Sequence, residues 1–253
     1  MLDNSLVSII MPTYNSILFI ENSINSILKQ SYRNFELLIT DDNSTDNTVF
    51  LIRKYMNLDT RIKLFQNDKN YGAAISRNIS LNFAKGRFVA FCDSDDIWLY
   101  NKLQDQINFM ISNNYYFTYT YYNLFINQYI VGKQIISPNK VNFQKILKNN
   151  YIGCSTVIYD QKKIHGFFFP LLKKRQDWAM WLSILSILDY AYCYPFSLTL
   201  YRVHDNSLSK NKFKLIKYNY NIYYKYLNYN KFKSLFYLIR FLFFYFKFKL
   251  FSK

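Results

Sequence analysis

Three aspartates, Asp93, Asp95 and Asp96, stand within four residues of one another, directly after the apolar segment 88–91. A short apolar run followed by polar residues is typical of a buried strand that ends in a loop. Carboxylates this close repel one another unless a cation or hydrogen-bond donors neutralise them. Oxygen ligands of this kind prefer Mg²⁺ or Mn²⁺ to softer ions. The spacing therefore predicts a divalent metal site, and the simpler alternative is an acidic turn that begins a helix over 97–110.

The chain around these acids is strongly basic. Its 253 residues include 32 Lys and Arg against 16 Asp and Glu. The length allows one domain of ordinary size with an appendage. Cys92, Cys154 and Cys193 are odd in number and far apart, so we expect neither a disulfide framework nor a thiolate metal site. The N-terminal residues do not resemble a secretory signal, and with the cysteine usage this favours a cytoplasmic protein.

Strand-like and helix-like patterns alternate along the first hundred residues. The apolar runs that predict strands are 6–11, 35–40, 62–65 and 88–91. The segments with helical spacing are 17–30, 47–55 and 73–84. This alternation predicts an α/β fold with a mostly parallel sheet, in which ligands bind at the carboxyl ends of the strands.

The second half has a mixed character. We expect strands over 154–159 and 191–201, and a helix that starts near Asp177. The residues expected on the buried side of that helix are Trp178, Trp181, Leu182 and Leu185. From residue 210 the composition changes, because 210–253 holds eleven Lys and Arg and no Asp or Glu.

Four motifs in order along the chain resemble the family 2 glycosyltransferases. The motifs are VSIIMPTYN at 7–15, LLITDDNSTD at 37–46, NYG at 70–72 with RN at 77–78, and AKGR at 84–87 leading into DSDD at 93–96. The resemblance is strong over about residues 5–100 and thinner to residue 209. It implies a GT-A fold, with a Rossmann-like central sheet flanked by helices. It also implies a nucleotide-sugar donor, a divalent cation (Mn²⁺ or Mg²⁺) and inversion at the anomeric carbon.

On this basis residues 1–209 are expected to form the GT-A domain. Residues 1–100 would be its nucleotide-sugar-binding half and 101–209 its acceptor-binding half, while 210–253 forms a basic, aromatic-rich helical tail. The expected donor-binding residues are Pro12, Thr13, Tyr14, Asn15, Asp42, Arg77, Asp93, Ser94 and Asp96. The expected metal ligands are Asp95 of the DXD motif and His204.

Individual roles follow from the chemistry of these residues. Tyr14 can place its ring against the base, and Asp42 can accept the imide hydrogen of a uracil. The simpler alternative is that 42–46 makes only a turn and a helix cap. The Arg77 fork could reach a diphosphate, or it could be a solvated helix charge. The family pattern assigns Asp93 to the ribose and Asp96 to the donor sugar or the loop.

A sugar hydroxyl needs a base to take its proton during an inverting transfer. The family usually places an Asp, preceded by Glu, at the start of a late helix. Asp177 matches this position, whereas Gln176 departs from the pattern. Asp177 is therefore the expected catalytic base, and a helix cap is the structural alternative.

The basic tail is the remaining feature. Its apolar segment 235–246 is interrupted only by Arg240, and about twelve residues cannot span a bilayer, which needs about twenty. Such a segment suits a helix at a membrane surface, with lysines toward anionic lipid. The alternative is a pair of helices packed on the domain with a basic outer face. Nucleic-acid binding gains no support from any recognised motif.

The sequence thus predicts a bacterial glycosyltransferase at the cytoplasmic face of the membrane. It would transfer one sugar from a UDP-sugar to a lipid-linked saccharide acceptor in surface-polysaccharide synthesis, such as O-antigen, lipopolysaccharide or capsule. No Gln-x-x-Arg-Trp segment of a processive synthase is present. A catalytically silent nucleotide-sugar-binding module on the same fold stays open. A nucleotidyltransferase is disfavoured, because residues 12–16 contain neither Gly nor Lys.

Overall fold

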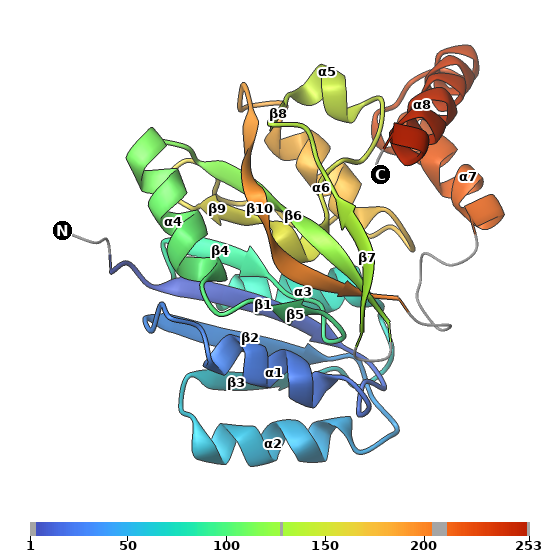
Figure 1. Ribbon diagram of the computed structural model, residues 1–253. Helices are drawn as coiled ribbons and strands as arrows, with labels where there is room; N and C mark the ends of the chain where they lie inside the picture. Colours follow the sequence, from blue (N-terminus) through green and yellow to red (C-terminus); the bar gives the residue numbers. More distant parts are fainter. Residues whose placement is uncertain (1–3, 127–128, 204–211, 252–253) are drawn as a thin grey trace.

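The computed structural model describes residues 4–126, 129–203 and 212–251 (Figure 1). Within these ranges one mixed sheet has the strand order β3-β2-β1-β4-β9-β6-β10-β5, with β7 beside β6 and β8 beside β10. The strands are β1 (Val7–Thr13), β2 (Phe35–Asp41), β3 (Ile62–Gln66), β4 (Phe88–Phe91), β5 (Ile97–Trp98), β6 (Phe117–Ile126), β7 (Tyr129–Ile135), β8 (Lys140–Val141), β9 (Ile158–Asp160) and β10 (Ala191–Arg202).

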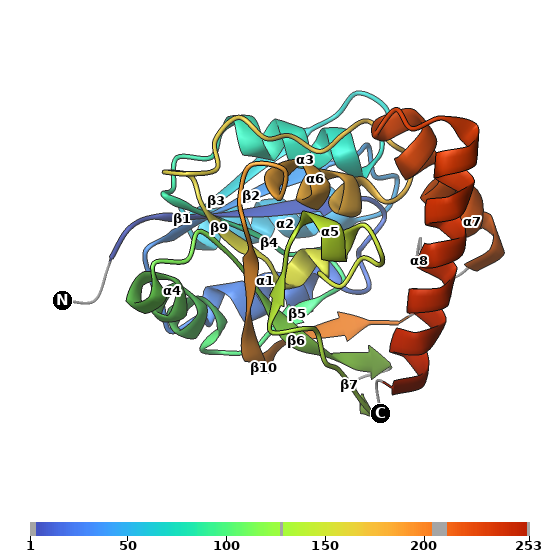
Figure 2. The same cartoon turned by 90° about the horizontal axis from the view of Figure 1, so that it is seen from above.

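Helices cover both faces of this sheet (Figures 1 and 2). The helices are α1 (Ile20–Leu28), α2 (Thr48–Leu58), α3 (Ala73–Asn82), α4 (Lys102–Asn113), α5 (Phe143–Ile146), α6 (Gln176–Ile184), α7 (Lys212–Asn221) and α8 (Lys231–Phe251), with a 3₁₀ turn at Cys154–Thr156 and a π-helical turn at Ile222–Tyr226. Alternate residues of the central strands supply two cores. Ile9 packs with α1, α2 and α4, whereas Ile10 packs with α3 and α6.

The first four strands form the parallel part of the sheet. β1 pairs in parallel with β2 and β4, and β2 pairs in parallel with β3. Every residue of β1 and β2 is buried, as expected for parallel strands covered on both faces. The register aligns Thr13 with Asp41 and Ile10 with Phe91. The loops after β1, β2 and β4 therefore meet at one edge of the sheet.

Two of the predicted elements are wrong in part. The predicted helix over 97–110 begins only at Lys102, because 97–98 form β5 and pair with Leu200 and Thr199 of β10. The predicted strand over 154–159 starts with a 3₁₀ turn, in which the Thr156 hydroxyl donates to the Gly153 carbonyl at 2.7 Å, and only 158–160 form β9. Both differences arise from tertiary contacts that local periodicity does not report.

The C-terminal helices pack on the domain through one face. The Trp178 ring of α6 lies 5.7 Å from the Tyr223 ring and 5.0 Å from the Phe241 ring of α8. The Tyr223 hydroxyl donates to the Leu147 carbonyl at 2.7 Å. Figure 2 shows α8 running along one side of the domain. In the described ranges no helix is both long and apolar enough to cross a bilayer.

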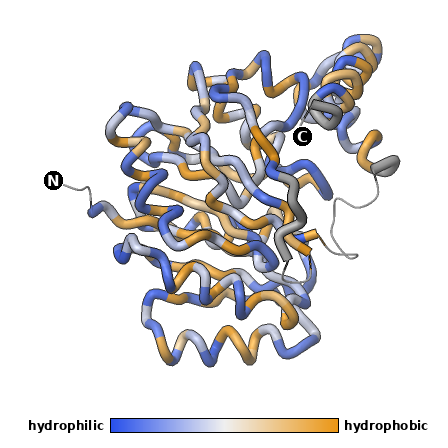
Figure 3. The backbone as a smooth tube through the Cα atoms, viewed as in Figure 1, coloured by the Kyte–Doolittle hydropathy of each residue, from blue (hydrophilic) through white to orange (hydrophobic). Residues whose placement is uncertain are grey.

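The opposite face of α8 exposes large apolar side chains. Figure 3 shows hydrophobic and hydrophilic residues alternating along this helix. The exposed apolar residues at helical spacing are Phe232, Phe236, Ile239, Phe243 and Phe246. Phe243 keeps 65% of its surface exposed, whereas Phe241 keeps only 2%. Both faces of α8 therefore carry apolar side chains, but one face is buried against the domain and the other is exposed to solvent.

Because Phe241 is buried against Trp178, replacing it by Ala should cost about 3–5 kcal/mol of unfolding free energy. The matched control is Phe243→Ala on the exposed face, which should change stability by less than about 0.5 kcal/mol. Urea denaturation followed by circular dichroism measures both. Equal losses for the two variants would show that the packed position of α8 does not contribute to stability.

Candidate active site

The loops after β1 and β2 are joined by hydrogen bonds. The Asn15 side-chain oxygen accepts from the Thr45 amide at 2.8 Å, and the Asn15 amide donates to the Ser44 hydroxyl at 2.9 Å. Asn15 has a φ of 47°, a left-handed conformation that Asn adopts more readily than most residues. The predicted donor-binding turn is thereby held in one shape, with the Tyr14 ring 48% exposed beside it.

The hydroxyl of Thr13 is the least satisfied group of this turn. Thr13 is 3% exposed, and its Oγ1 has no hydrogen-bond partner among the described residues. A buried hydroxyl without a partner costs free energy, unless a ligand or an ordered water satisfies it. Thr13 therefore fits the predicted role of contacting a nucleotide.

Asp42 lies at the end of β2 and holds the segment that leads into α3. Its Oδ1 accepts from the Asn67 side chain at 2.7 Å and from the Tyr71 amide at 2.8 Å, and its Oδ2 accepts from the Gly72 amide at 2.7 Å. An ionised carboxylate has about four acceptor positions, so these bonds leave room for one more donor, such as an imide. Asp41 Oδ2 accepts from the Ser44 amide at 2.9 Å within the turn. Asp46 accepts from the Thr48 amide at the start of α2 at 3.0 Å, which agrees with the capping alternative for that residue.

Arg77 projects from α3 onto the first aspartate of the acidic loop. Its Nη2 lies 2.6 Å from Asp93 Oδ1, and the Phe169 ring lies 5.1 Å from the guanidinium carbon. Burial by itself would lower the pKa of Arg77, but the neighbouring Asp93 raises it. The predicted solvated helix charge is wrong, since Arg77 is only 6% exposed. Its Nε has no partner among the described residues.

Arg202, at the end of β10, orders the rest of the acidic loop. Its backbone amide donates to Asp96 Oδ1 at 3.0 Å, and its Nε donates to the Asp95 carbonyl at 2.9 Å. The Ser94 hydroxyl shares a hydrogen bond of 2.9 Å with Ser16. Sequence reasoning gave no role to Arg202, and its proximity to His204 in the chain was the one available signal. His204 itself lies outside the described residues.

The acidic loop has the chemistry that a divalent cation requires. Asp96 Oδ2 is buried and has no hydrogen-bond partner among the described residues. Burial raises the pKa of Asp96, and the charges of Asp95 and Asp93 raise it further. Among the described residues, no group of three His, Cys, Asp or Glu side chains is placed so that it could hold a metal ion. Crowded carboxylates with an unsatisfied oxygen nevertheless fit Mg²⁺ or Mn²⁺.

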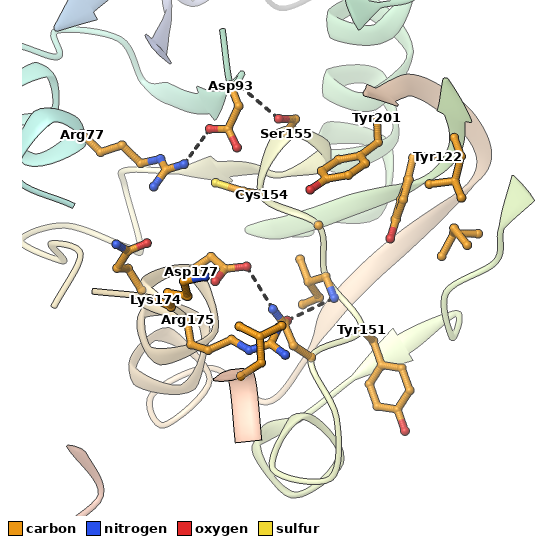
Figure 4. Close-up of a pocket in the computed structure, with 17 residues that line it drawn as sticks. Arg77, Asp93, Tyr122, Tyr151, Cys154, Ser155, Lys174, Arg175, Asp177 and Tyr201 are labelled. Carbon is orange, nitrogen blue, oxygen red and sulfur yellow. Dashed lines mark hydrogen bonds and ion pairs between the residues drawn. The ribbon is translucent and has the colours of Figure 1, made fainter. Parts of the chain in front are cut away.

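Asp177 faces the acidic loop across a cavity of about 350 Å³. It lies in the first turn of α6, and its Oδ2 accepts from the Asn150 side chain at 3.0 Å. Figure 4 shows Arg77 and Asp93 on one side of the cavity and Asp177 on the other. The amide of Asn150, which sequence reasoning missed, orients the carboxylate. The predicted base and a predicted donor-binding residue thus line one space.

This arrangement, a sheet with acidic loops at its carboxyl edge, defines a GT-A fold, and comparison with solved structures agrees. The chain matches Staphylococcus aureus TarS 1–349 in complex with UDP with a TM-score of 0.69 and 24% identity, over 93% of this chain and 70% of that one. It matches the mannosyltransferase PcManGT from Pyrobaculum calidifontis in complex with GDP-Man and Mn²⁺ with a TM-score of 0.70 and 17% identity, over 90% of this chain and 65% of that one.

Sequence comparison identifies the family. The glycosyl transferase family 2 profile matches residues 8–170. The chain is 46% identical over 223 residues to WfgD of Escherichia coli, a UDP-Glc:alpha-D-GlcNAc-diphosphoundecaprenol beta-1,3-glucosyltransferase, covering 87% of this chain and 86% of that one. It is 39% identical over 219 residues to the putative teichuronic acid biosynthesis glycosyltransferase TuaG of Bacillus subtilis, covering 86% and 87%. The chain therefore belongs to glycosyl transferase family 2, which confirms the predicted family, fold and enzyme class.

The Arg77–Asp93 pair should show strong energetic coupling. Asp93→Asn leaves the Arg77 charge buried without its partner, which should cost about 3 kcal/mol. The double variant with Arg77→Met should lose less than the sum of the single losses, by about 1–3 kcal/mol. A double-mutant cycle by urea denaturation measures this, and the matched control is the more exposed Arg61–Asp59 pair, where we expect at most about 1 kcal/mol. Additive losses at Arg77 and Asp93 would contradict the inferred coupling.

Proposed function

We propose that this glycosyltransferase is an inverting, metal-dependent enzyme of bacterial surface-polysaccharide synthesis. It transfers one sugar from a UDP-sugar to a lipid-linked saccharide acceptor. The observation that carries the proposal is the placement of Asp177 and Asp93 on opposite sides of one cavity (Figure 4). The relatives WfgD and TuaG, whose names describe a lipid-linked acceptor and polysaccharide synthesis, support the substrate class.

The donor occupies the carboxyl edge of the parallel strands. The turn 12–15 and Asp42 bind the nucleoside, with Tyr14 against the base and the Thr13 hydroxyl as a further contact. Asp93 binds the ribose, while Ser94 and Asp96 hold the loop around the donor. Arg77 fixes Asp93 and lies within the same cavity, so its charge offsets that of the diphosphate. The UDP complex of TarS supports this location.

Asp95 and His204 would hold Mn²⁺ or Mg²⁺ in this site, with Asp96 as a neighbouring carboxylate. When bound, this ion supplies Lewis-acid stabilisation of the negative charge that develops on the leaving group. The unsatisfied Asp96 Oδ2 and the crowding of the three aspartates support this assignment. The Mn²⁺ complex of PcManGT is consistent with it.

Asp177 acts as the general base. Inversion requires the acceptor hydroxyl to attack the anomeric carbon from the face opposite the leaving diphosphate. Asp177 lies on the wall of the cavity that faces Asp93, so it can take the proton of a hydroxyl that attacks from that side. The Asn150 amide donates to Oδ2 of Asp177 and leaves Oδ1 to accept the hydroxyl proton. Gln176, where the family usually has Glu, hydrogen-bonds weakly to the Lys173 carbonyl at 3.4 Å and does not take part in this step.

The first test is hydrolysis of UDP-sugars, because water can replace the unknown acceptor. With Mn²⁺ present, the wild type should release UDP from one donor of a panel. Asp95→Ala should lower this rate at least about a hundredfold, since it removes the ligand that holds the ion on the leaving group. Asp177→Asn should lower transfer to acceptor by about 10²–10⁴. UDP production measured by a coupled assay gives each rate.

A surface variant provides the control for this assay. Asp68→Asn changes the same functional group outside the cavity and should keep the wild-type rate. Tight UDP binding by the wild type without hydrolysis or transfer for any donor would instead support the catalytically silent binding module.

We also propose that α8 attaches the enzyme to the inner, cytoplasmic face of the membrane. Its packed face lies on the domain, and its exposed apolar face is flanked by the exposed residues Lys231, Lys233 and Lys247. Apolar side chains that enter the interface, with lysines near anionic head groups, are typical of helices that lie on a membrane. The packing on the domain agrees with the alternative prediction for the tail, but the outer face is apolar with flanking lysines, not basic throughout.

Sedimentation with phosphatidylglycerol vesicles tests this attachment. The double variant Phe236→Gln/Phe243→Gln should bind at least about tenfold more weakly, because each Phe contributes about 1.5–3 kcal/mol when fully buried. The matched control is Phe50→Gln, which replaces a 73%-exposed Phe of α2 at the other end of the domain. Raised salt should weaken binding through the lysines. Equal sedimentation of both variants and the wild type would contradict the proposal.

A further inference from the structure

Arg175 is a cation of the cavity that the donor site and the base do not use. It precedes α6 in a left-handed conformation, with a φ of 66°. Its Nε donates to Asn219 Oδ1 of α7 at 2.8 Å. The neighbouring Lys174 also lines the cavity, and its ammonium lies 6.0 Å from the Tyr218 ring of α7. Contacts with α7 therefore orient the side chains of Arg175 and Lys174 on this side of the cavity.

Among the described residues, the charge of Arg175 has no acidic side chain in ion-pair contact. By contrast, Arg77 across the cavity is paired with Asp93 at 2.6 Å. Burial lowers the pKa of Arg175, and the charge of Asp177 opposes this shift. The guanidinium of Arg175 is partly desolvated, and its hydrogen bond to Asn219 is made by Nε. The N–H groups of its two terminal nitrogens can therefore donate to a ligand. Such a group favours an anionic ligand, and a phosphate suits its fork geometry.

We propose that Arg175, together with Lys174, binds the diphosphate that links the acceptor's first sugar to its lipid. This inference rests on the proposed function, which supplies a lipid-linked acceptor. Arg175 lies on the same side of the cavity as Asp177, across from the Arg77–Asp93 pair of the proposed donor side (Figure 4).

Arg175 and the proposed base belong to the same wall of the cavity. Asp177, which takes the proton of the attacking hydroxyl, lies two residues after Arg175, and both line the same cavity. The acceptor sugar carries its reacting hydroxyl and its diphosphate at different ring positions. A sugar whose hydroxyl reaches Asp177 can therefore place its diphosphate against Arg175.

The path of the lipid is also consistent. Leu215 of α7 lines the cavity, and Asn219 of α7 holds Arg175. The α7 and α8 helices pack together on this side of the domain. A lipid that leaves the diphosphate next to α7 continues along the tail whose outer face we assign to the membrane. The tail would thus link membrane attachment to acceptor binding.

Binding measurements on the full chain test the site without requiring turnover. The enzyme is saturated with UDP and Mg²⁺, so that the donor site is filled. Two probes are then titrated by calorimetry: a short-chain α-D-GlcNAc-diphosphate lipid and the same sugar linked to the chain without the diphosphate. The wild type should bind the diphosphate probe at least about tenfold more tightly, as charge-assisted hydrogen bonds to a diphosphate predict.

Arg175→Gln should lose this preference. Lys173→Gln is the matched control, because it removes the same charge from an exposed neighbour outside the cavity, and it should keep the preference. The ratio of the two dissociation constants cancels any loss that both probes share. Equal preference in Arg175→Gln and the wild type, or no preference in the wild type, would overturn the inference.

A second titration, with UDP alone, tests whether Arg175 binds the diphosphate of the donor or that of the acceptor. If Arg175→Gln weakens UDP binding tenfold but keeps its preference between the probes, the residue serves the donor and the inference fails. A transfer assay then judges the proposed function independently. If Arg175→Gln loses the preference but the wild type transfers sugar from no donor, the anion site is supported and the proposed function is refuted. If the wild type transfers sugar but shows no preference for the diphosphate probe, the function is supported and the anion site is refuted.

Discussion

Repulsion among the carboxylates of the acidic loop is the constraint on which the rest of the site depends. Asp93, Asp95 and Asp96 lie within one turn of chain, and Asp96 is nearly inaccessible to water. Arg77 pairs with the first, and Arg202 at the end of β10 binds the loop through Asp95 and Asp96. Burial raises the pKa of Asp96, and the charges of Asp95 and Asp93 raise it further. A loop built in this way is stable enough to fold and still favours a cation.

The parallel sheet converts this local chemistry into a site. Because β1 lies between β2 and β4 in register, the donor turn, the Asp42 loop and the acidic loop are placed side by side. Hydrogen bonds between these loops, such as Ser16 to Ser94 and Asn15 to Thr45, then fix their mutual positions. The side chains of the proposed donor site are thus preorganised by backbone pairing, which lowers the ordering cost of binding.

The second wall depends on the mixed half of the fold. β9, β6 and β10 extend the sheet, and the Trp181 ring of α6 lies 5.7 Å from Phe91 of β4. This packing sets the distance between Asp177 and the acidic loop. The tail packs on the same helix through Trp178 and holds Arg175 through Asn219. One helix therefore connects the base, the candidate anion site and the proposed membrane face.

The sequence by itself determined the alternating elements of the first hundred residues, the family and the identity of the acidic loop, because these depend on local periodicity and on motifs that are contiguous in the chain. The tertiary structure decided that 97–98 form a strand, that Arg77 faces Asp93, and that Arg202, Asn150 and Asn219 hold groups far away in sequence. It also decided that α8 has one packed and one exposed face, since both faces are apolar and contacts with Trp178 and Tyr223 distinguish them. Such pairings join residues tens of positions apart, so no local pattern contains them.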